Sequence, residues 1–227
     1  MKIIYTNISK EKYSEVSNYI KYLSSIRQDK VRGFKFEKDK LRSIFGELLL
    51  RYALKEYFNI EFDKCKIIFN KYGKPYIIHE TNLKFNLSHS GNIIICAISY
   101  QSVGIDIEEN KALDLGTLVY CLHENEQYCL RQYNSKEALD LFYNYWVLKE
   151  SYLKYIGVGL LYPLNKIGFT ITKDKIRLFT ELDIEKDLSF KLFHLLNKYS
   201  VAICYAKKEN IDIEMADANL IKSIFYD

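Results

Sequence analysis

A short strand-like segment with two acidic residues, Gly104-Ile105-Asp106-Ile107-Glu108, constrains this chain more than any other stretch. In a β-strand, successive side chains point to opposite faces, so Asp106 and Glu108 share one face and the two isoleucines share the other. Two carboxylates held that close repel each other unless a cation lies between them. Mg²⁺ favours such oxygen ligands and usually keeps waters and a substrate phosphate in its shell. An ordinary edge strand with two solvated acids is the alternative interpretation.

Composition and charge narrow the class of protein. The chain has 227 residues, of which 48% are hydrophobic, enough for one large domain or two small ones with a real core. No apolar run approaches the length of a membrane span, and the N-terminal segment lacks the apolar core of a signal peptide. The five cysteines are scattered without a CxxC pair, which argues against zinc and a disulfide framework and favours the cytoplasm. The net charge of +4 suits phosphate ligands or an acidic partner, but it does not indicate nucleic acid.

Hydrophobic periodicity and turn residues predict alternating helices and strands. The turn Tyr72-Gly73-Lys74-Pro75 separates two short strands, and a polar turn over 86–92 leads into an apolar strand. We expect helices over about 10–31, 38–58, 114–121, 124–132 and 136–156, and strands over about 2–8, 66–69, 76–78, 83–87, 93–98, 103–108, 166–172, 175–180, 189–195 and 200–206.

Residues 1–103 and 104–227 echo each other weakly. Leu54-Lys55-Glu56 and Leu148-Lys149-Glu150 each lie in a helix that precedes strands, and a second acidic segment, Ile211-Asp212-Ile213-Glu214, again follows an apolar strand. We therefore expect an α/β (α+β) fold of two similar halves, related by a pseudo-twofold axis and packed as one body. A cleft between two such halves is a common place for a ligand. The second acidic segment is expected to lie in a charged tail without a chemical role.

The predicted helix over 136–156 carries three functional groups on one face. Trp146, Glu150 and Lys154 occupy positions i, i+4 and i+8, and they place an aromatic ring, a carboxylate and an amine side by side. A Glu–Lys pair on a helix surface, worth a few tenths of a kcal/mol, is the alternative. Together with Asp106 and Glu108, Glu150 can form a Mg²⁺ site.

These motifs resemble those of a known family. The first acidic segment, combined with Trp146-Val147-Leu148-Lys149-Glu150-Ser151-Tyr152-Leu153-Lys154, resembles the two signature motifs of 4′-phosphopantetheinyl transferases. Tyr72-Gly73-Lys74-Pro75 and Phe85-Asn86-Leu87-Ser88-His89-Ser90 resemble two further motifs of that family. With its length and its two halves, the chain is similar to the larger surfactin-synthetase-activating (Sfp-type) group and not to the short trimeric acyl-carrier-protein synthases. The resemblance covers roughly residues 27–170.

The resemblance implies an enzyme with holo-[acyl-carrier-protein] synthase activity. Such an enzyme transfers 4′-phosphopantetheine from coenzyme A to a serine of a carrier protein and releases adenosine 3′,5′-bisphosphate. It implies that Asp106, Glu108 and Glu150 hold Mg²⁺ and that Lys154 reaches the α-phosphate and steadies the leaving group. Glu150, or a metal-held water near Glu108, is the expected base. Coenzyme A contacts are implied for Lys154 and for Arg27, Lys30, Ser43, Lys74, Ser88 and His89, with Arg42 adjacent; Arg27 stands where the family often has lysine.

The resemblance also implies a protein partner. Residues 111–135 fall where the family docks its acyl or peptidyl carrier protein, which generally presents an acidic helix. The segment mixes apolar Leu113, Leu115, Leu118, Val119 and Leu122 with basic Lys111 and Arg131. The alternative is two small amphipathic helices packed on the body. Two halves within one chain make a monomer sufficient.

Two other functions stay open on the sequence alone. One is a non-catalytic protein of the same fold that binds coenzyme A or docks carriers, against which the intact Asp106, Glu108, Glu150 and Lys154 argue. The other is a different Mg²⁺-dependent phosphoryl-transfer enzyme, such as a nucleotide hydrolase, which would need no docking surface for a protein. Fatty-acid, polyketide, nonribosomal-peptide and lysine-pathway carriers all stay open as partners.

Overall fold

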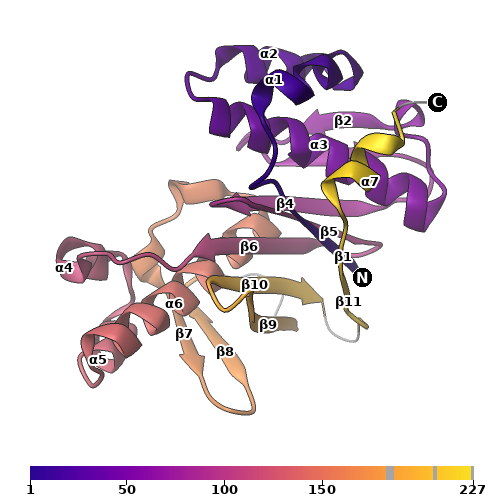
Figure 1. The fold of residues 1–227 in the computed structure, drawn as a ribbon. Helices are drawn as coiled ribbons and strands as arrows, with labels where there is room; N and C mark the ends of the chain where they lie inside the picture. The colour runs from indigo at the N-terminus through magenta and orange to yellow at the C-terminus, as the bar shows by residue number, and fades with distance from the viewer. Residues whose placement is uncertain (183–186, 207–208, 226–227) are drawn as a thin grey trace.

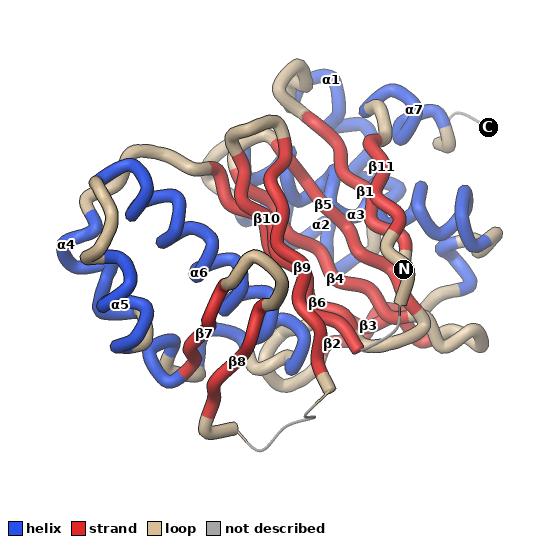
Figure 2. Tube along the Cα trace, turned by 90° about the horizontal axis from the view of Figure 1, so that it is seen from below, coloured by secondary structure: helices blue, strands red, loops and turns tan. Residues whose placement is uncertain are grey.

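The computed structural model describes residues 1–182, 187–206 and 209–225. Its two larger sheets lie between two groups of helices (Figures 1 and 2). The helices are α1 (Tyr13–Val16), α2 (Ser25–Gly33), α3 (Glu37–Phe58), α4 (Leu115–Leu118), α5 (Glu124–Leu130), α6 (Ser135–Ile156) and α7 (Ala218–Ser223). The strands are β1 (Lys2–Asn7), β2 (Lys66–Phe69), β3 (Pro75–Ile78), β4 (Lys84–Ser90), β5 (Ile93–Ser99), β6 (Val103–Glu109), β7 (Ile167–Ile171), β8 (Ile176–Thr180), β9 (Leu188–Leu195), β10 (Tyr199–Ala206) and β11 (Asp212–Met215).

The first half is built from α3 and the sheet with strand order β11-β1-β5-β4. The helix predicted over 38–58 buries its apolar residues, with Phe45, Leu48 and Leu49 fully inside the core. This helix ends at Asn59, whose left-handed backbone (φ 53°) allows its amide to bond back to the last turn. Every residue of β5 is buried, as its continuous apolar sequence predicts.

The second half repeats this plan with α6 and the sheet β6-β10-β9. The helix starts at Asn134, whose side chain accepts hydrogen bonds from the backbone of Lys136 and Glu137. It ends at Gly157 (φ 74°), as the sequence predicts. The two-stranded hairpins β2–β3 and β7–β8 occupy corresponding places in the order of the two halves. The expected fold of two similar α/β halves is confirmed.

The two halves meet where β4 lies against β6. The side chain of Asn86 on β4 accepts a hydrogen bond from the backbone N–H of Ile105 on β6, with a donor–acceptor distance of 2.8 Å. Behind this contact, Ile95 of β5, Ile105 of β6 and Val201 of β10 belong to one fully buried apolar cluster. The halves therefore share a core, and residues of β4 and β6 can form a single site.

Two predicted elements differ in detail from the structure. The helix expected over 10–31 is divided into α1, a 3₁₀ turn (Ser17–Tyr22) and α2, because the chain turns at Ser24. The backbone N–H and hydroxyl of Ser24 donate to the carboxylate of buried Glu47, at 2.6 and 2.7 Å. The polar turn expected over 86–92 is shorter than predicted, because β4 continues to Ser90 and only Gly91 and Asn92 turn the chain.

The second acidic segment also differs from its prediction, because it is a strand rather than a charged tail. β11 pairs in parallel with β1, with Lys2 opposite Asp212 and Ile4 opposite Glu214. The Lys2 amine lies 2.8 Å from the Asp212 carboxylate and 2.5 Å from that of Glu214. The last residues of the chain thus return to the first half, where α7 packs against α3 (Figure 1).

Candidate active site

The site begins with matched side chains on β4 and β6. Asp106 and Glu108 point to the same side of β6, and Ser88 and Ser90 occupy facing positions on β4. Ser88 Oγ donates a hydrogen bond to Asp106 Oδ1 at 2.8 Å, and Ser90 Oγ donates to Glu108 Oε2 at 2.7 Å. The i, i+2 spacing of the two acids therefore does place both carboxylates on one face, where a neighbouring strand meets them.

A close approach of α6 to β6 brings the second motif to the first. A Cβ atom at Gly104 would lie 2.0 Å from the backbone oxygen of Ser151 and 2.4 Å from the backbone nitrogen of Tyr155. Any other residue would push the helix away from the strand, since real Cβ atoms do not make contacts that short. Gly104 is therefore required for α6 to lie against the strand that carries Asp106.

Lys154 on α6 completes a triangle with the first carboxylate. Its amine donates to Asp106 Oδ1 at 2.5 Å and to Ser88 Oγ at 2.8 Å. Asp106 is buried, with 3% of its surface exposed, so this charge-assisted contact is shielded from water. The other oxygen, Asp106 Oδ2, is buried and has no hydrogen-bond partner among the described residues.

Glu150 lies one helical turn before Lys154 and adds negative charge to the same place. Its Oε1 is also buried without a hydrogen-bond partner in the described part of the chain. Burial and then the charge of Asp106 raise the pKa of Glu150 to about 7, and the Lys154 charge only partly opposes them. Burial likewise raises the pKa of Glu108, with the Asp106 charge adding to it and the Ser90 hydrogen bond opposing it. The cluster therefore carries more negative charge than Lys154 alone offsets.

Asp106 and Glu150 could supply part of the coordination shell of a Mg²⁺ ion. Within residues 1–182, 187–206 and 209–225, no group of three or more His, Cys, Asp or Glu side chains is arranged to hold a metal ion. Asp106 Oδ2 and Glu150 Oε1 nevertheless offer two buried oxygens that bond to no other group in the described part of the chain. Mg²⁺ is usually bound by one or two carboxylates, with waters and substrate phosphates filling its octahedron. The two residues fit that requirement, whereas Glu108 has one oxygen bonded to Ser90.

A cavity of about 230 Å³ opens on the first-half side of these acids. It is lined by Arg27, Lys30, Phe34, Asp39, Arg42, Ser43, Gly46, Pro75, Asn86, Leu87, Ser88, His89 and Ile94. Six of these residues, Arg27, Lys30, Arg42, Ser43, Ser88 and His89, carry a coenzyme A contact predicted from the sequence. The fold thus gathers them around one space from α2, α3 and β4. Because Ser88 also bonds Asp106, this space adjoins the carboxylates.

The cavity is positively charged. Arg42 donates to the backbone oxygen of Gly91 at 2.9 and 3.0 Å and pairs with Asp39, so its guanidinium is held in place. Lys30 has no ion-pair partner among the described residues, and burial, followed by the charge of Arg27, lowers its pKa. Desolvation, then the charges of Arg42, Lys154 and Lys30, lowers the pKa of His89. An anion bound here would relieve this mutual repulsion.

Two residues with a predicted coenzyme A contact, Lys74 and Lys154, do not line this cavity, and the Lys74 side chain points elsewhere. Its neighbour Pro75 lines the cavity, but the Lys74 side chain does not. Its amine donates to three backbone oxygens, those of Val103, Lys154 and Tyr155, at 3.3, 2.5 and 3.1 Å. The coenzyme A contact of Lys74 therefore stays a prediction.

A buried ion pair between Lys149 and Glu126 supports the helix, and the sequence analysis did not identify it. The two charged atoms are 2.7 Å apart and both side chains are fully buried. Glu126 also accepts hydrogen bonds from the backbone N–H of His123 and of Phe169. Lys149 donates to the backbone oxygens of Leu164 and Ile167. The available signal was position, because Lys149 lies on the same helical stripe as buried Tyr145 and Tyr152.

The predicted docking segment is partly exposed. Leu113, Leu118 and Tyr120 are 43%, 36% and 71% exposed, whereas Leu122 is fully buried in the core of the second half. Lys111, at the start of the segment, pairs with Glu109 at 2.7 Å. The segment thus combines anchoring residues with apolar residues that face solvent.

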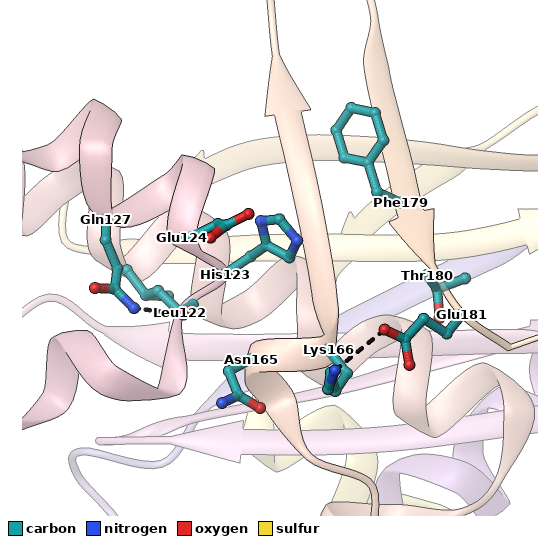
Figure 3. Close-up of a pocket in the computed structure, with 9 residues that line it drawn as sticks. All are labelled: Leu122, His123, Glu124, Gln127, Asn165, Lys166, Phe179, Thr180 and Glu181. Carbon is teal, nitrogen blue, oxygen red and sulfur yellow. Dashed lines mark hydrogen bonds and ion pairs between the residues drawn. The ribbon is translucent and has the colours of Figure 1, made fainter.

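A second cavity, of about 520 Å³, lies in the second half between α5 and the start of the β7–β8 hairpin (Figure 3). It is lined by Leu122, His123, Glu124, Gln127, Asn165, Lys166, Phe179, Thr180 and Glu181. The first four belong to the predicted docking segment 111–135, and none of the nine carries a predicted coenzyme A or metal contact. Lys166 is paired with Glu181 at 3.1 Å, and the Gln127 amide donates to the backbone of Leu122. Two of its charged groups, Lys166 and Glu181, are therefore already paired with each other.

Comparison with known proteins agrees with this geometry. A family model described as the 4′-phosphopantetheinyl transferase superfamily matches residues 102–204, and one described as 4′-phosphopantetheinyl transferase, N-terminal, matches residues 10–101. The chain is 30% identical over 225 residues to the 4′-phosphopantetheinyl transferase gsp of Aneurinibacillus migulanus, a match that covers 98% of this chain and 87% of that protein. It is 29% identical over 192 residues to the 4′-phosphopantetheinyl transferase Sfp of Bacillus subtilis strain 168, covering 85% of this chain and 86% of that protein.

Among solved structures, a holo-(acyl-carrier-protein) synthase from Bacillus anthracis in complex with CoA (3′,5′-ADP) matches with a TM-score of 0.42 and 20% identity. That match covers 48% of this chain and 96% of the other.

Relatives named as transferases cover most of this chain, so the chain is a transferase, and it belongs to the 4′-phosphopantetheinyl transferase superfamily. Its likeness to gsp and Sfp along most of its length assigns it to the Sfp-type group within that superfamily. None of the helices in the described residues has the length and apolar character needed to cross a membrane.

Proposed function

We propose that this protein transfers the 4′-phosphopantetheine group from coenzyme A to a serine of acyl or peptidyl carrier proteins, with Mg²⁺ as its cofactor. The carrier is thereby converted from the apo to the holo form, and adenosine 3′,5′-bisphosphate is released. The observation that carries the proposal is the position of Ser88. It lines the cationic cavity and bonds both Asp106 and Lys154, so an anion in the cavity would extend toward the acid cluster.

The cavity suits the adenosine end of coenzyme A. Arg27, Lys30 and His89 line this space, and a phosphate group would be held there by charge-assisted hydrogen bonds. Ser43 lies within 3.4 Å of the Arg27 guanidinium and adds a hydroxyl near the start of α3. The pyrophosphate would then lie toward Ser88 and Lys154.

The acid cluster suits the reacting pyrophosphate. Asp106 and Glu150, with Glu108 beside them, would hold Mg²⁺. When bound, the ion would neutralise negative charge on the phosphates. Lys154 would donate to an oxygen of the adenosine-side phosphate and stabilise its negative charge as it leaves. Phosphoryl transfer of this kind depends mainly on positioning and charge stabilisation, so no enzyme nucleophile is required.

The reaction forms one bond and breaks one. The serine hydroxyl oxygen of the carrier attacks the phosphorus that bears pantetheine, and the bond from that phosphorus to the bridging oxygen breaks. The bridging oxygen leaves with adenosine 3′,5′-bisphosphate, and the serine proton passes to a base. Glu150, or a metal-held water near Glu108, would take that proton.

The carrier would dock on residues 111–135. Exposed Leu113, Leu118 and Tyr120 provide an apolar contact, and the protein's positive net charge would attract an acidic helix. We further propose that the protein acts as a monomer, because both halves of the site belong to one chain. We also propose a cytoplasmic location, because its cysteines are free.

Mass spectrometry of an apo carrier protein, incubated with coenzyme A, Mg²⁺ and this protein, tests the function. We expect the mass of one phosphopantetheine to be added on one serine, and we expect a chelator to abolish the gain. Binding of coenzyme A without any mass gain would instead indicate a non-catalytic protein. Hydrolysis of the pyrophosphate in the absence of a carrier would indicate a different phosphoryl-transfer enzyme.

A further inference from the structure

Side chains of the β2–β3 hairpin in the first half cap the C-terminal end of α6 in the second half; we call this set of contacts the closure. The last four carbonyl groups of an α-helix have no partner within the helix. In α6 the Gly157 N–H bonds to Leu153, which leaves Lys154 and the residues after it to find other donors. The Lys74 amine bonds the backbone oxygens of Lys154 and Tyr155, and its positive charge lies at the negative end of the helix dipole.

A second side chain of the hairpin reinforces the closure. Asn70 Nδ2 donates to the backbone oxygen of Gly157 at 2.7 Å. Its Oδ1 accepts hydrogen bonds from the backbone N–H groups of Tyr72 and Lys74, both at 2.9 Å, which fixes the turn that carries Lys74. Asn70 therefore holds both the end of the helix and the shape of the hairpin.

The closure also reaches β6 at the point where β6 and α6 are closest. The Lys74 amine donates to the backbone oxygen of Val103, the residue before Gly104. A Cβ atom at Gly157 would lie 2.9 Å from the Tyr76 hydroxyl and 3.1 Å from Lys74 Cδ, so hairpin and helix end are in close contact. One amine thus joins the hairpin, the start of β6 and the last turn of α6.

We propose that Lys74 and Asn70 are positioning residues for the transfer reaction, which fix the last turn of α6 against β6 so that the Lys154 amine stays on Asp106 and Ser88. Lys74 bonds the backbone of Lys154 itself, so movement of the hairpin is passed directly to that residue. This inference rests on the proposed function, because it assigns Lys154 a role in transfer. It does not require a direct contact between Lys74 and coenzyme A.

The test compares Lys74→Met, which keeps most of the aliphatic stem but no donor, with Asn70→Ala. For both variants we expect kcat for carrier modification to fall about 10- to 100-fold, the cost of a small misplacement of a catalytic group. The Kd for coenzyme A, measured by calorimetry, should stay near that of the wild type. Hydrogen–deuterium exchange should become faster in peptides covering residues 150–158, while β5 keeps its protection.

Two control variants separate positioning from ligand binding. Lys71→Met removes an exposed amine from the same hairpin and should leave kcat, Kd and exchange unchanged. Lys30→Met removes a cation from the cavity and should weaken coenzyme A binding without faster exchange in α6.

Two results would overturn the proposal. One is a loss of coenzyme A affinity in Lys74→Met as large as in Lys30→Met, with exchange in α6 unchanged. The other is a wild-type kcat in both hairpin variants. The exchange experiment needs no turnover, so it still reports on the closure if the wild-type protein fails to modify any carrier; that failure would contradict the proposed function instead.

Discussion

The amine of Lys154 lies 2.5 Å from Asp106 Oδ1, although the two residues are 48 positions apart in the sequence and belong to a helix and a strand. This contact joins the two motifs that the sequence separates. Asp106 Oδ2 and Glu150 Oε1 are both buried and have no hydrogen-bond partner among the described residues. The predictions below test this contact, the packing that creates it and the surfaces around it.

Replacing Asp106 should abolish transfer while the fold survives. Asp106→Ala removes the partner of Lys154 and one of the two unpartnered oxygens, and we expect kcat/KM to fall on the order of 100-fold or more. The matched control is Asp212→Ala in the second acidic segment. Its carboxylate is exposed and pairs with Lys2 at the surface, so activity should stay near wild type. Carrier modification at the normal rate by Asp106→Ala would refute the assignment.

Gly104→Ala should separate α6 from β6. The new methyl group would meet backbone atoms of Ser151 and Tyr155, which cannot rotate away, so we expect the free energy of unfolding to fall by about 1–3 kcal/mol or more. Activity should fall as well, because Lys154 moves with the helix. Gly33→Ala is the control, since a Cβ atom there has no neighbour within 4 Å. Chemical denaturation measures both variants, and equal stability of the two would contradict the packing argument.

The cavity should recognise the 3′-phosphate of coenzyme A. Lys30→Met and His89→Ala each remove a group that can bond phosphate, and a charge-assisted contact is worth roughly 1.5–3 kcal/mol. We expect KM for coenzyme A to rise about tenfold or more, with a smaller change in kcat. The preference for coenzyme A over 3′-dephospho-coenzyme A should narrow in both variants. If that preference equals the wild-type value, the 3′-phosphate is bound elsewhere.

Lys74 should make stability depend on pH. Burial lowers the pKa of Lys74 to about 8 from its usual 10.5, with the Cys204 thiol opposing this shift. Between these two values the unfolded chain binds the proton more tightly than the folded one, so the free energy of unfolding should rise with pH. Below pH 8 the cost of burying the charged amine is fully present.

The measurement is the stability difference between the wild type and Lys74→Met at several values from pH 7 to pH 10. We expect this difference to move in favour of the wild type above pH 8. Lys71→Met provides a reference whose difference from the wild type should not vary with pH. A constant difference for Lys74→Met would mean that its amine is solvated rather than enclosed by the three carbonyl groups.

The exposed leucines should contribute to carrier recognition. Leu113→Ser and Leu118→Ser should lower kcat/KM for the carrier several-fold, because each removes apolar surface that the bound carrier would cover, a contact worth about 1–2 kcal/mol. Both variants should leave KM for coenzyme A unchanged. Leu220→Ser is the control, since Leu220 is 50% exposed on α7 in the other half. Equal kinetics for all three variants would remove the docking role from residues 111–135.

Salt should affect the two substrates differently. Exposed charges are screened beyond a Debye length of about 8 Å at physiological ionic strength, so kcat/KM for the carrier should fall as salt rises. Charge reversal at Lys111 and Arg131 should flatten this dependence. Lys111 is paired with Glu109, so reversal there also sets two negative charges side by side. The same salt response for carrier and coenzyme A, in wild type and variant, would argue against steering by this segment.

The sequence by itself determined the faces and the ends of the central elements. The i, i+2 spacing of Asp106 and Glu108 set one face of β6, and Gly157 set the end of α6, because both depend on local backbone geometry. The motifs also indicated which residues surround the cationic cavity, since six of the predicted contacts line it.

Only the tertiary structure decided which side chains and strands contact each other. Nothing in the local sequence shows that Ser90 meets Glu108, that Lys149 pairs with Glu126, or that β11 returns to β1. Lys74 is the clearest case. The sequence predicted its turn correctly, but it did not show that the Lys74 amine bonds backbone oxygens of Lys154 and Tyr155 in the second half. Spacing along a chain fixes the direction of a side chain relative to its own element, whereas its contacts depend on which elements pack together and how closely.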